Sequence, residues 1–239
     1  MEALIFDCDG VLVDTERDGH RVAFNKAFEE KSIDAVWDVD EYKELVKVAG
    51  GKERMKYFFN KNGWPGNYLD KEELIVELHK LKTLIFMKMI ESGELPLRPG
   101  IKRLIDEAIA DKIMLAVCST SNEKSVNLIV EKLLGEKRKV HFNGIFAGDV
   151  VSLKKPDPEI YNLCASKLKL NPQNCFVVED SRNGLVAAKA AGFNCLVTTN
   201  EYTKKEDFTE ANFVVDELGD GENIQITIET LKTYILKQP

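Results

Sequence analysis

The chain has 239 residues, of which 44% are hydrophobic and 31% are charged, a composition that provides a core for one large or two modest domains. Its 40 acidic and 33 basic residues give a formal charge of −7, which argues against nucleic acid as a partner because binding to phosphate backbones requires a basic surface. No apolar run approaches the roughly 20 residues of a membrane-spanning helix. The sequence therefore implies neither a membrane nor an obligate protein partner.

In chain order, short apolar runs rich in β-branched residues predict buried strands, and the amphipathic stretches between them predict helices. This alternation predicts an α/β fold with a doubly wound parallel sheet. The segment 219–223 is expected to form a loop before a terminal helix. The predicted strands span 3–7, 113–118, 144–147, 174–178, 194–198 and 212–215, and the predicted helices span 100–111, 122–134, 157–169 and 182–191.

The segment from residue 15 to residue 95 breaks the alternation, because it contains only helical patterns. Polar residues before it and prolines after it mark its boundaries. We expect an α/β core made of residues 1–14 and 96–239, with residues 15–95 inserted as a helical cap that two links join to the core like a hinged lid. The predicted cap helices span 17–31, 40–48, 52–61 and 70–92.

The cysteines show no close paired spacing of the kind found in zinc or redox motifs. Several of them lie in apolar runs, so we expect reduced, buried thiols and a soluble protein of a reducing compartment. The chain begins its first apolar run directly after Glu2, without a signal or transit sequence, but a presequence that has been removed leaves no trace. The expected location is thus the cytoplasm or the plastid stroma. The five cysteines are Cys8, Cys118, Cys164, Cys175 and Cys195.

Two carboxylates emerge at the end of the first predicted strand, in the run ALIFDCDG. Asp7 and Asp9 are followed by Gly10, which permits a sharp turn. Two like charges so close together are costly unless a cation neutralises them or one carboxyl keeps its proton. Taken alone, this motif is explained by a structural turn or an unrelated cation-binding loop as well as by a catalytic site.

Further polar groups follow three other predicted strands. Ser119 could donate its hydroxyl to a phosphoryl oxygen, with the backbone amides of Thr120 and Ser121 beside it, although a helix cap explains Ser119 as well. Lys155 precedes a proline, which favours an extended backbone and leaves its ammonium free for a phosphoryl group; a solvated loop lysine, as expected for Lys154, is the alternative.

Glu179 and Asp180 end another strand beside the first carboxylate pair, which indicates a site for a hard metal ion. Asp180 or Ser181 could instead cap the following helix. Because the carboxyl ends of parallel strands meet at one edge of a sheet, all these groups are expected to lie together, which favours a catalytic site over four independent structural explanations.

The segments DCDG, Ser119, Lys155 and Glu179-Asp180 resemble the motifs of the haloacid dehalogenase-like phosphohydrolase superfamily, and the resemblance spans the chain. The helical insertion after the first motif is similar to the cap of its β-phosphoglucomutase-like branch. Within that branch, DGVLVDTE, GGKER, HKLK, STSNEK and KKPDPEIY resemble the CbbY-type group. This resemblance implies a phosphatase that acts on a small sugar bisphosphate, xylulose 1,5-bisphosphate.

The resemblance also implies a role for each motif residue. The nucleophile would form an aspartyl-phosphate, a second aspartate would act as acid and base, and Mg²⁺ would be the cofactor. These roles fall to Asp7 as nucleophile, Asp9 as acid and base, Ser119 and Lys155 as phosphoryl-binding groups, and Asp7, Asp9 (through its carbonyl), Asp180 and Glu179 around the metal.

A glycine pair opens a cap helix, where free backbone amides and two basic side chains could bind a second phosphate. A glycine turn, a solvated charged helix and a surface histidine are the plainer explanations, and the resemblance favours the binding function. Further side chains could reach the sugar. The candidate substrate-binding residues are Gly50, Gly51, Lys52, Glu53 and Arg54, His79 and Lys82 on one helix face, Glu16 in the cap linker, and Asn122 and Lys124 on the core.

Two alternatives to a phosphatase stay open. A mutase of the β-phosphoglucomutase type shares the nucleophile but returns the phosphoryl group to a sugar, and it needs a closed cap that excludes water. His20 lies near the position of a cap histidine in that group, but its spacing from Asp14 is one residue longer. A catalytically silent sugar-phosphate sensor is the other alternative, although such a protein is expected to have lost part of the acidic set.

Overall fold

The computed structural model describes residues 1–48, 50–66, 68 and 70–237. The chain forms two compact units, one made of Met1–Asp14 together with Pro96–Pro239 and the other of Thr15–Leu95. We refer to them as the α/β unit and the helical unit.

The α/β unit is built on a sheet of six strands in the order β3-β2-β1-β4-β5-β6. All of its neighbouring strands pair in parallel. This order reverses direction between β1 and β4, and ligands of open α/β sheets bind at such a switch point, outside the carboxyl ends of the strands. The strands are β1 (Ala3–Phe6), β2 (Met114–Ser119), β3 (Phe142–Ala147), β4 (Cys175–Glu179), β5 (Asn194–Thr198) and β6 (Phe213–Val215).

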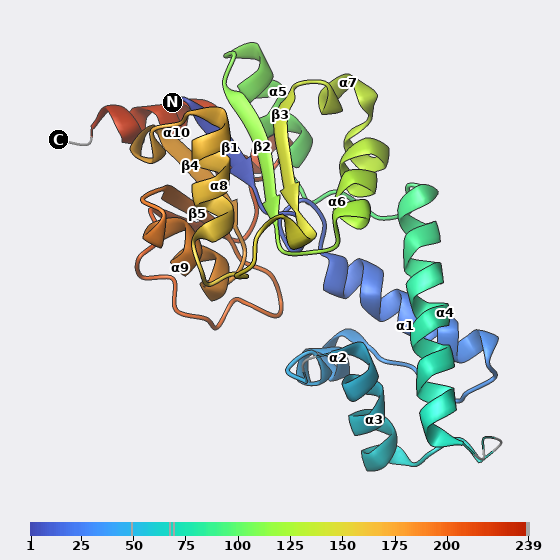
Figure 1. Ribbon diagram of the computed structural model, residues 1–239. Coiled ribbons are helices and arrows are strands. Elements are labelled where there is room, and N and C mark those ends of the chain that lie inside the picture. The colour runs from blue at the N-terminus through green and yellow to red at the C-terminus, as the bar shows by residue number, and fades with distance from the viewer. Residues whose placement is uncertain (49, 67, 69, 238–239) are drawn as a thin grey trace. The chain divides into compact units, whose positions relative to one another are not determined.

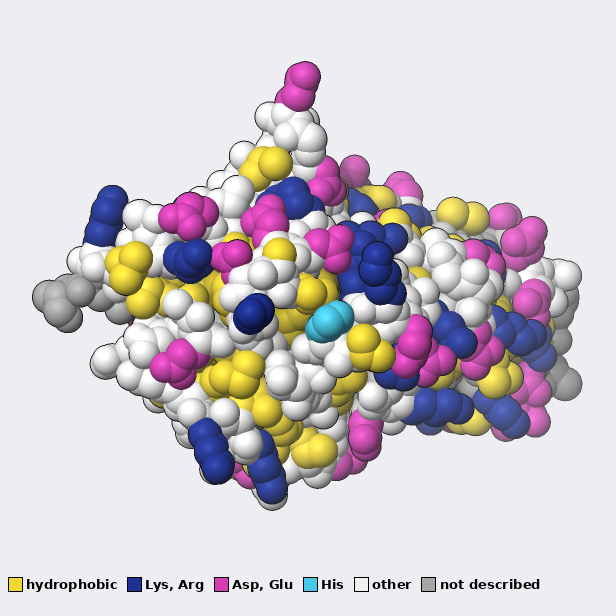
Figure 2. All heavy atoms as spheres, turned by 90° about the horizontal axis from the view of Figure 1, so that it is seen from above, with side chains coloured by type: hydrophobic (Ala, Val, Ile, Leu, Met, Phe, Trp, Pro, Cys, Tyr) yellow, Lys and Arg dark blue, Asp and Glu magenta, His cyan; other side chains and the backbone are white. Residues whose placement is uncertain are grey.

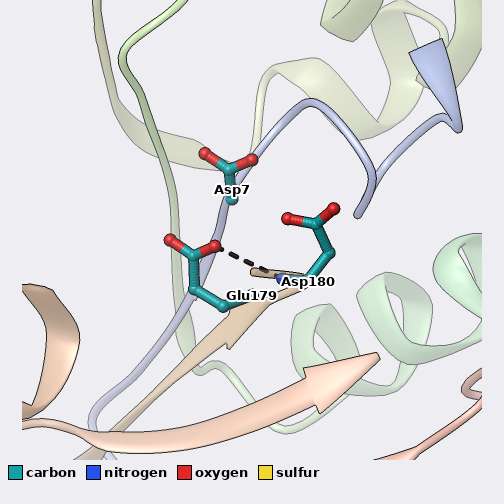
Figure 3. Close-up of side chains that lie close together, drawn as sticks. All are labelled: Asp7, Glu179 and Asp180. Atoms are coloured by element: carbon teal, nitrogen blue, oxygen red, sulfur yellow. Dashed lines mark hydrogen bonds between the residues drawn. The ribbon is translucent and has the colours of Figure 1, made fainter. Parts of the chain in front are cut away.

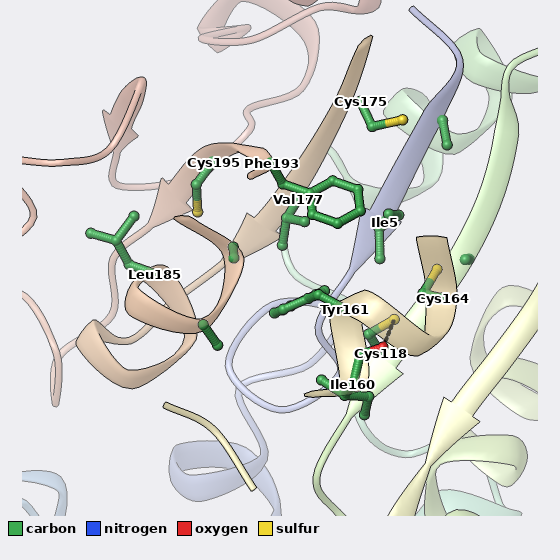
Figure 4. Packing of buried hydrophobic residues seen from close by; sticks show 14 of the residues in the cluster. Ile5, Cys118, Ile160, Tyr161, Cys164, Cys175, Val177, Leu185, Phe193 and Cys195 are labelled. Atoms are coloured by element: carbon green, nitrogen blue, oxygen red, sulfur yellow. Dashed lines mark hydrogen bonds between the residues drawn. The ribbon is translucent and has the colours of Figure 1, made fainter. Parts of the chain in front are cut away.

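Helices cover both faces of this sheet, as parallel connections require (Figure 1). On one face, α8 and α9 contribute to a buried cluster in which Tyr161, Cys164 and Leu185 pack against Ile5 and Val177 of the strands (Figure 4). On the other face, the ring of Tyr234 in α10 packs edge-on against Phe176, with ring centroids 5.7 Å apart. The helices of the unit are α5 (Ile101–Ala110), α6 (Glu123–Ile129), α7 (Glu136–Lys139), α8 (Glu159–Leu168), α9 (Arg182–Ala190) and α10 (Ile228–Leu236).

The helical unit has its own core, formed by aromatic side chains. Trp37 lies fully buried between Phe24 and Phe28, with ring centroids 4.7 and 5.0 Å away. Burying large aromatic surfaces in this way stabilises a small helical unit without help from a sheet. Its helices are α1 (Arg21–Glu30), α2 (Val39–Leu45), α3 (Gly51–Asn62) and α4 (Lys71–Glu91), preceded by a π-helical segment at Thr15–His20.

The predicted fold class is confirmed, and the differences lie at element boundaries. The predicted helix 17–31 divides into the π-helical segment and α1, and the predicted helix 122–134 continues past Ile129 as a π-helical segment. Strand β3 begins at Phe142, two residues before its predicted start. The short helix α7 was not predicted, and its charged sequence EKRK has no apolar periodicity that would have indicated it.

The five cysteines are buried and free, as their apolar surroundings predicted. None of the helices in the described ranges combines the length and the apolar character needed to cross a bilayer. On the face drawn in Figure 2, acidic and basic side chains are interspersed.

Candidate active site

A polar pocket lies at the carboxyl ends of β1, β2 and β4. It brings together the predicted residues that follow these three strands, Lys155 from the loop before α8, and one side chain from the start of α9 that the sequence did not indicate. Its lining consists of Asp7, Asp9, Ser119, Thr120, Ser121, Lys155, Glu179, Asp180, Ser181 and Asn183.

Lys155 is the positive centre of this pocket. Its Nζ donates to Asp7 Oδ1 and to Glu179 Oε1, both at 2.6 Å, and to the carbonyl of Cys118 at 3.0 Å. All three donors of the ammonium are therefore used. The expectation of a free ammonium was wrong, because the neighbouring strand ends supply acceptors on every side.

Glu179 is 1% exposed, and both oxygens of its carboxylate accept hydrogen bonds. Its Oε1 accepts from Lys155 and from the hydroxyl of Tyr161, and its Oε2 accepts from the backbone amide of Asp180 at 3.3 Å. A side chain at Gly184 would collide with this carboxylate, so the first turn of α9 requires glycine there. The tyrosine was not predicted, yet its ring also lies 5.0 Å from the Lys155 ammonium.

Asp7, Glu179 and Asp180 form a compact acidic cluster, and their carboxylates face a common space (Figure 3). Each offers an oxygen that lies within 4.8 Å of the oxygens offered by the other two. One lysine cannot neutralise three carboxylates. Oxygen ligands with excess negative charge are the donor set that a hard divalent cation prefers, so the residues present fit such an ion.

Burial and neighbouring charges shift the pKa values of the groups in this cluster. Burial raises the pKa of Asp7 to about 7; Lys155 opposes this rise, while Glu179 and Asp9 add to it. Burial likewise raises the pKa of Asp180 well above its usual range, with further contributions from Glu179 and Asp7. Burial alone would lower the pKa of Lys155, but the attraction of Asp7 and Glu179 raises it. The cluster thus binds either protons or a cation.

Asp9 and the serines of the second motif lie on the β2 side of the pocket. The hydroxyl of Ser121 donates to Asp9 Oδ2, and the amide of Ser121 donates to the hydroxyl oxygen of Ser119 at 3.1 Å. Helix α6 is capped by Asn122 and not by Ser119. The helix-cap explanation for Ser119 is therefore wrong, and its hydroxyl belongs to the pocket together with Thr120.

Two residues of the α/β unit that were predicted to bind substrate lie outside the pocket lining. The Oδ1 of Asn122 accepts from the amides of Lys124 and Ser125 at 3.0 and 3.3 Å, so this side chain serves as the cap of α6. Lys124 is exposed on that helix. In the fourth motif, Ser181 caps α9 by accepting from the amide of Gly184 at 3.2 Å, whereas Asp180 faces the acidic cluster.

Within the helical unit, Arg54 is the centre of a polar cluster. It is 7% exposed, and its guanidinium lies 3.3 Å from Glu16 Oε2 and donates to the hydroxyl of Tyr42. That hydroxyl in turn donates to Glu16 at 2.6 Å. The sequence predicted two of the three members, and Tyr42 was missed because nothing in its local pattern separates it from a core aromatic residue.

Lys82 also lies in the interior of the helical unit. Burial lowers its pKa to about 8. Its ammonium is 3.4 Å from His20 Nδ1 and 4.9 Å from the centre of the Phe24 ring. His79, one turn earlier on α4, lies close to Gly51.

The remaining residues of the GGKER segment do not join this polar cluster. Lys52 and Glu53 are exposed. The carboxylate of Glu53 folds back against Gly50 at the start of α3, where it places an acidic group beside the amides that were expected to be free for a second phosphate.

Comparison with known proteins identifies the class to which this fold and pocket belong. A match to the haloacid dehalogenase-like hydrolase family covers residues 1–192. The chain therefore belongs to that family, as the motifs predicted.

Within this family, the chain is similar in sequence and structure to the CbbY proteins. It is 55% identical over 240 residues to a CBBY-like protein of Arabidopsis thaliana, covering 99% of this chain and 75% of that protein. It is 39% identical to protein CbbY of Cereibacter sphaeroides, covering 95% and 98%. The crystal structure of a CbbY variant from Rhodobacter sphaeroides in complex with xylulose-(1,5)bisphosphate superposes with a TM-score of 0.73 at 38% identity, covering 97% and 99%. The prediction of a CbbY-related enzyme of the phosphatase class is confirmed at this level.

The raised pKa of Asp7 predicts how the stability of the metal-free protein depends on pH. The unfolded chain titrates with a pKa of about 4, so the folded protein binds this proton more tightly. The stabilisation is complete below pH about 4 and is lost as the pH rises through about 7. Urea unfolding in EDTA should therefore show that the wild type loses stability relative to Asp7→Asn over this range. Parallel pH profiles for the two proteins would contradict the assignment.

Proposed function

We propose that this protein is an Mg²⁺-dependent phosphatase that hydrolyses a sugar bisphosphate through an aspartyl-phosphate on Asp7. The observation that carries the proposal is the acidic cluster of Asp7, Glu179 and Asp180 around a single buried lysine, at the switch point of the sheet. Such a cluster suits a cation and, through it, an anionic substrate.

In the first step, a carboxylate oxygen of Asp7 attacks phosphorus while the bond from phosphorus to the sugar oxygen breaks. Asp9 donates a proton to the leaving oxygen, so the sugar departs as an alcohol. Ser119, with the loop at Thr120, binds the equatorial oxygens of the phosphoryl group. Lys155 joins them by exchanging one of its three present acceptors for a phosphoryl oxygen, since all three of its donors are in use.

In the second step, a water molecule attacks the phosphorus of the aspartyl-phosphate. Asp9, now a carboxylate, takes a proton from that water, and the bond to Asp7 breaks to release inorganic phosphate and restore both groups. The Ser121 hydroxyl that donates to Asp9 Oδ2 orients Asp9 for these transfers. Acid and base catalysis thus falls to one residue, and the nucleophile is regenerated in each cycle.

Asp7, Asp180 and the backbone carbonyl of Asp9 would hold Mg²⁺, with Glu179 beside them. Because Glu179 already accepts from Lys155 and Tyr161, we assign it to fixing the lysine in place of direct ligation. Bound Mg²⁺ supplies the positive charge that lets an anionic carboxylate approach an anionic phosphate.

Xylulose 1,5-bisphosphate is the substrate that we propose, with the helical unit as the cap that selects it. The proposal is supported by the CbbY complex with this compound and by the extent of similarity to that protein. Within the helical unit, Arg54, Tyr42 and Glu16 offer a cation and polar oxygens for the sugar and the second phosphate, and Lys82 offers a further cation. We propose the cytoplasm or the plastid stroma as the location of the protein.

The two alternatives are less well supported. The chain is 28% identical to the β-phosphoglucomutase of Bacillus subtilis, which is below its identity to the CbbY relatives. His20, the candidate for a mutase histidine, lies beside Lys82 and packs on Phe86 with ring centroids 4.1 Å apart. A silent sensor would not need the full acidic cluster with its buried lysine.

Replacement of the nucleophile tests the chemistry. Asp7→Asn should lower turnover of a sugar bisphosphate by about a thousandfold or more, because the amide cannot attack phosphorus. Phosphate release in the presence of Mg²⁺ measures this, with Asp149→Asn, which alters a fully exposed carboxylate outside the pocket lining, as the matched control. If Asp7→Asn keeps turnover within a few-fold of the wild type, Asp7 is not the nucleophile. Formation of an isomeric monophosphate without free phosphate would identify a mutase.

Replacement of the cap arginine tests the choice of substrate. Arg54→Ala should lower kcat/KM for xylulose 1,5-bisphosphate by about tenfold to a hundredfold, the range for losing hydrogen bonds to a charged group. Turnover of a generic aryl phosphate should change by no more than a few-fold, because that substrate lacks a second phosphate. Arg21→Ala is the control, since Arg21 binds the carbonyls of Arg17 and Trp37 in the same unit. Equal losses on both substrates would contradict a selecting role.

A further inference from the structure

The carboxylate of Asp180 contacts the loop that follows β5. Its Oδ2 accepts from Nδ2 of Asn200 at 2.8 Å. The same oxygen lies against the Cα of Gly10, and any side chain at that position would collide with it. Asp180 thus lies between a hydrogen-bond donor and the turn of the first motif, with little room to rotate.

The orientation of the Asn200 amide is itself determined by its surroundings. Its Oδ1 accepts from the amides of Tyr202 and Thr203 at 2.9 and 3.1 Å. Two backbone donors require the oxygen on that side, so the NH₂ group must face Asp180. The backbone amide of Asn200 donates to the Thr203 hydroxyl at 3.2 Å, which closes the turn.

Arg98 joins this turn to the loop that carries Asp9 and Gly10. Its guanidinium donates to the carbonyl of Gly10, to the carbonyl of Thr198 at 3.0 Å and to the carbonyl of Thr199 at 2.6 Å. The two loops that confine Asp180 are therefore fixed to each other by one side chain. A rigid donor on a ligand carboxylate sets its direction before the ion arrives.

We propose that Asn200 is the positioning residue for Asp180 as a ligand of the divalent cation, with Arg98 fixing the distance between the two loops. This inference rests on the proposed function, since it concerns the metal that the acidic cluster binds. Asn200 Nδ2 stabilises the ionised carboxylate and restricts its rotation, so the loss of this contact should weaken metal binding more than it impairs the chemical step.

The substitution Asn200→Ser removes the contact with Asp180 but can keep the hydrogen bonds within the turn. A serine hydroxyl can still accept from the amides of the turn, but it is too short to reach Asp180. Calorimetric titration of the metal-stripped, substrate-free protein with Mg²⁺ should give a dissociation constant raised by about tenfold to a hundredfold. Phosphate release at saturating Mg²⁺ should return to within a few-fold of the wild type. Asn200→Ala should weaken Mg²⁺ binding at least as much.

Asn212→Ser is the matched control at the opposite end of β5. Asn212 accepts from the amide of Cys195 at 2.7 Å and donates to the Tyr234 hydroxyl at 2.7 Å, so its loss lowers stability without touching the acidic cluster. It should leave the Mg²⁺ dissociation constant unchanged. If Asn200→Ser binds Mg²⁺ as tightly as the wild type, the positioning role is wrong and the proposed function stands. If the wild type itself binds no Mg²⁺, the proposed function fails and this inference with it.

Discussion

The confinement of three carboxylates with a single lysine is the constraint on which the rest of the pocket depends. Oxygens of Asp7, Glu179 and Asp180 lie within 4.8 Å of one another, and two like charges at about this separation repel by roughly 3 to 4 kcal/mol at an effective dielectric constant near 20. Lys155 forms ion pairs with Asp7 and Glu179, but its single positive charge cannot neutralise all three carboxylates. The cluster must therefore bind protons or a cation. Burial, together with the repulsion from Glu179 and Asp9, raises the pKa of Asp7 to about 7.

The parallel sheet is what makes this concentration of charge possible. Strands β1 and β4 are neighbours at the switch point, so residues far apart in the chain emerge side by side at one edge. The apolar cluster to which α8 and α9 contribute packs against these strands, and Tyr161 extends from that cluster to both Glu179 and Lys155. The packing of the core thus continues directly into the polar contacts of the pocket.

The sequence predicted the residues at strand ends because one rule, the meeting of parallel strands at their carboxyl ends, brings them together whatever the details of packing. That rule does not extend to side chains that act through tertiary contacts. Tyr161 lies on a helix face and Asn200 in a polar loop, where such residues are ordinary, and only the folded contacts distinguish them. The same limit explains why Lys155 was expected to be free and why Asn122 was expected at the pocket. Local patterns likewise did not reveal where helices change to π-helical geometry.

The most direct test of the central claim is the thermal unfolding of metal-stripped protein with increasing Mg²⁺. An ion that binds only the folded protein adds about 2.7 kcal/mol at a hundred times its dissociation constant. The unfolding temperature of the wild type should therefore rise with Mg²⁺ concentration, whereas that of Asp180→Asn should stay nearly constant. Identical unfolding temperatures of the wild type with and without Mg²⁺ would contradict the claim that this acidic cluster is built for a cation.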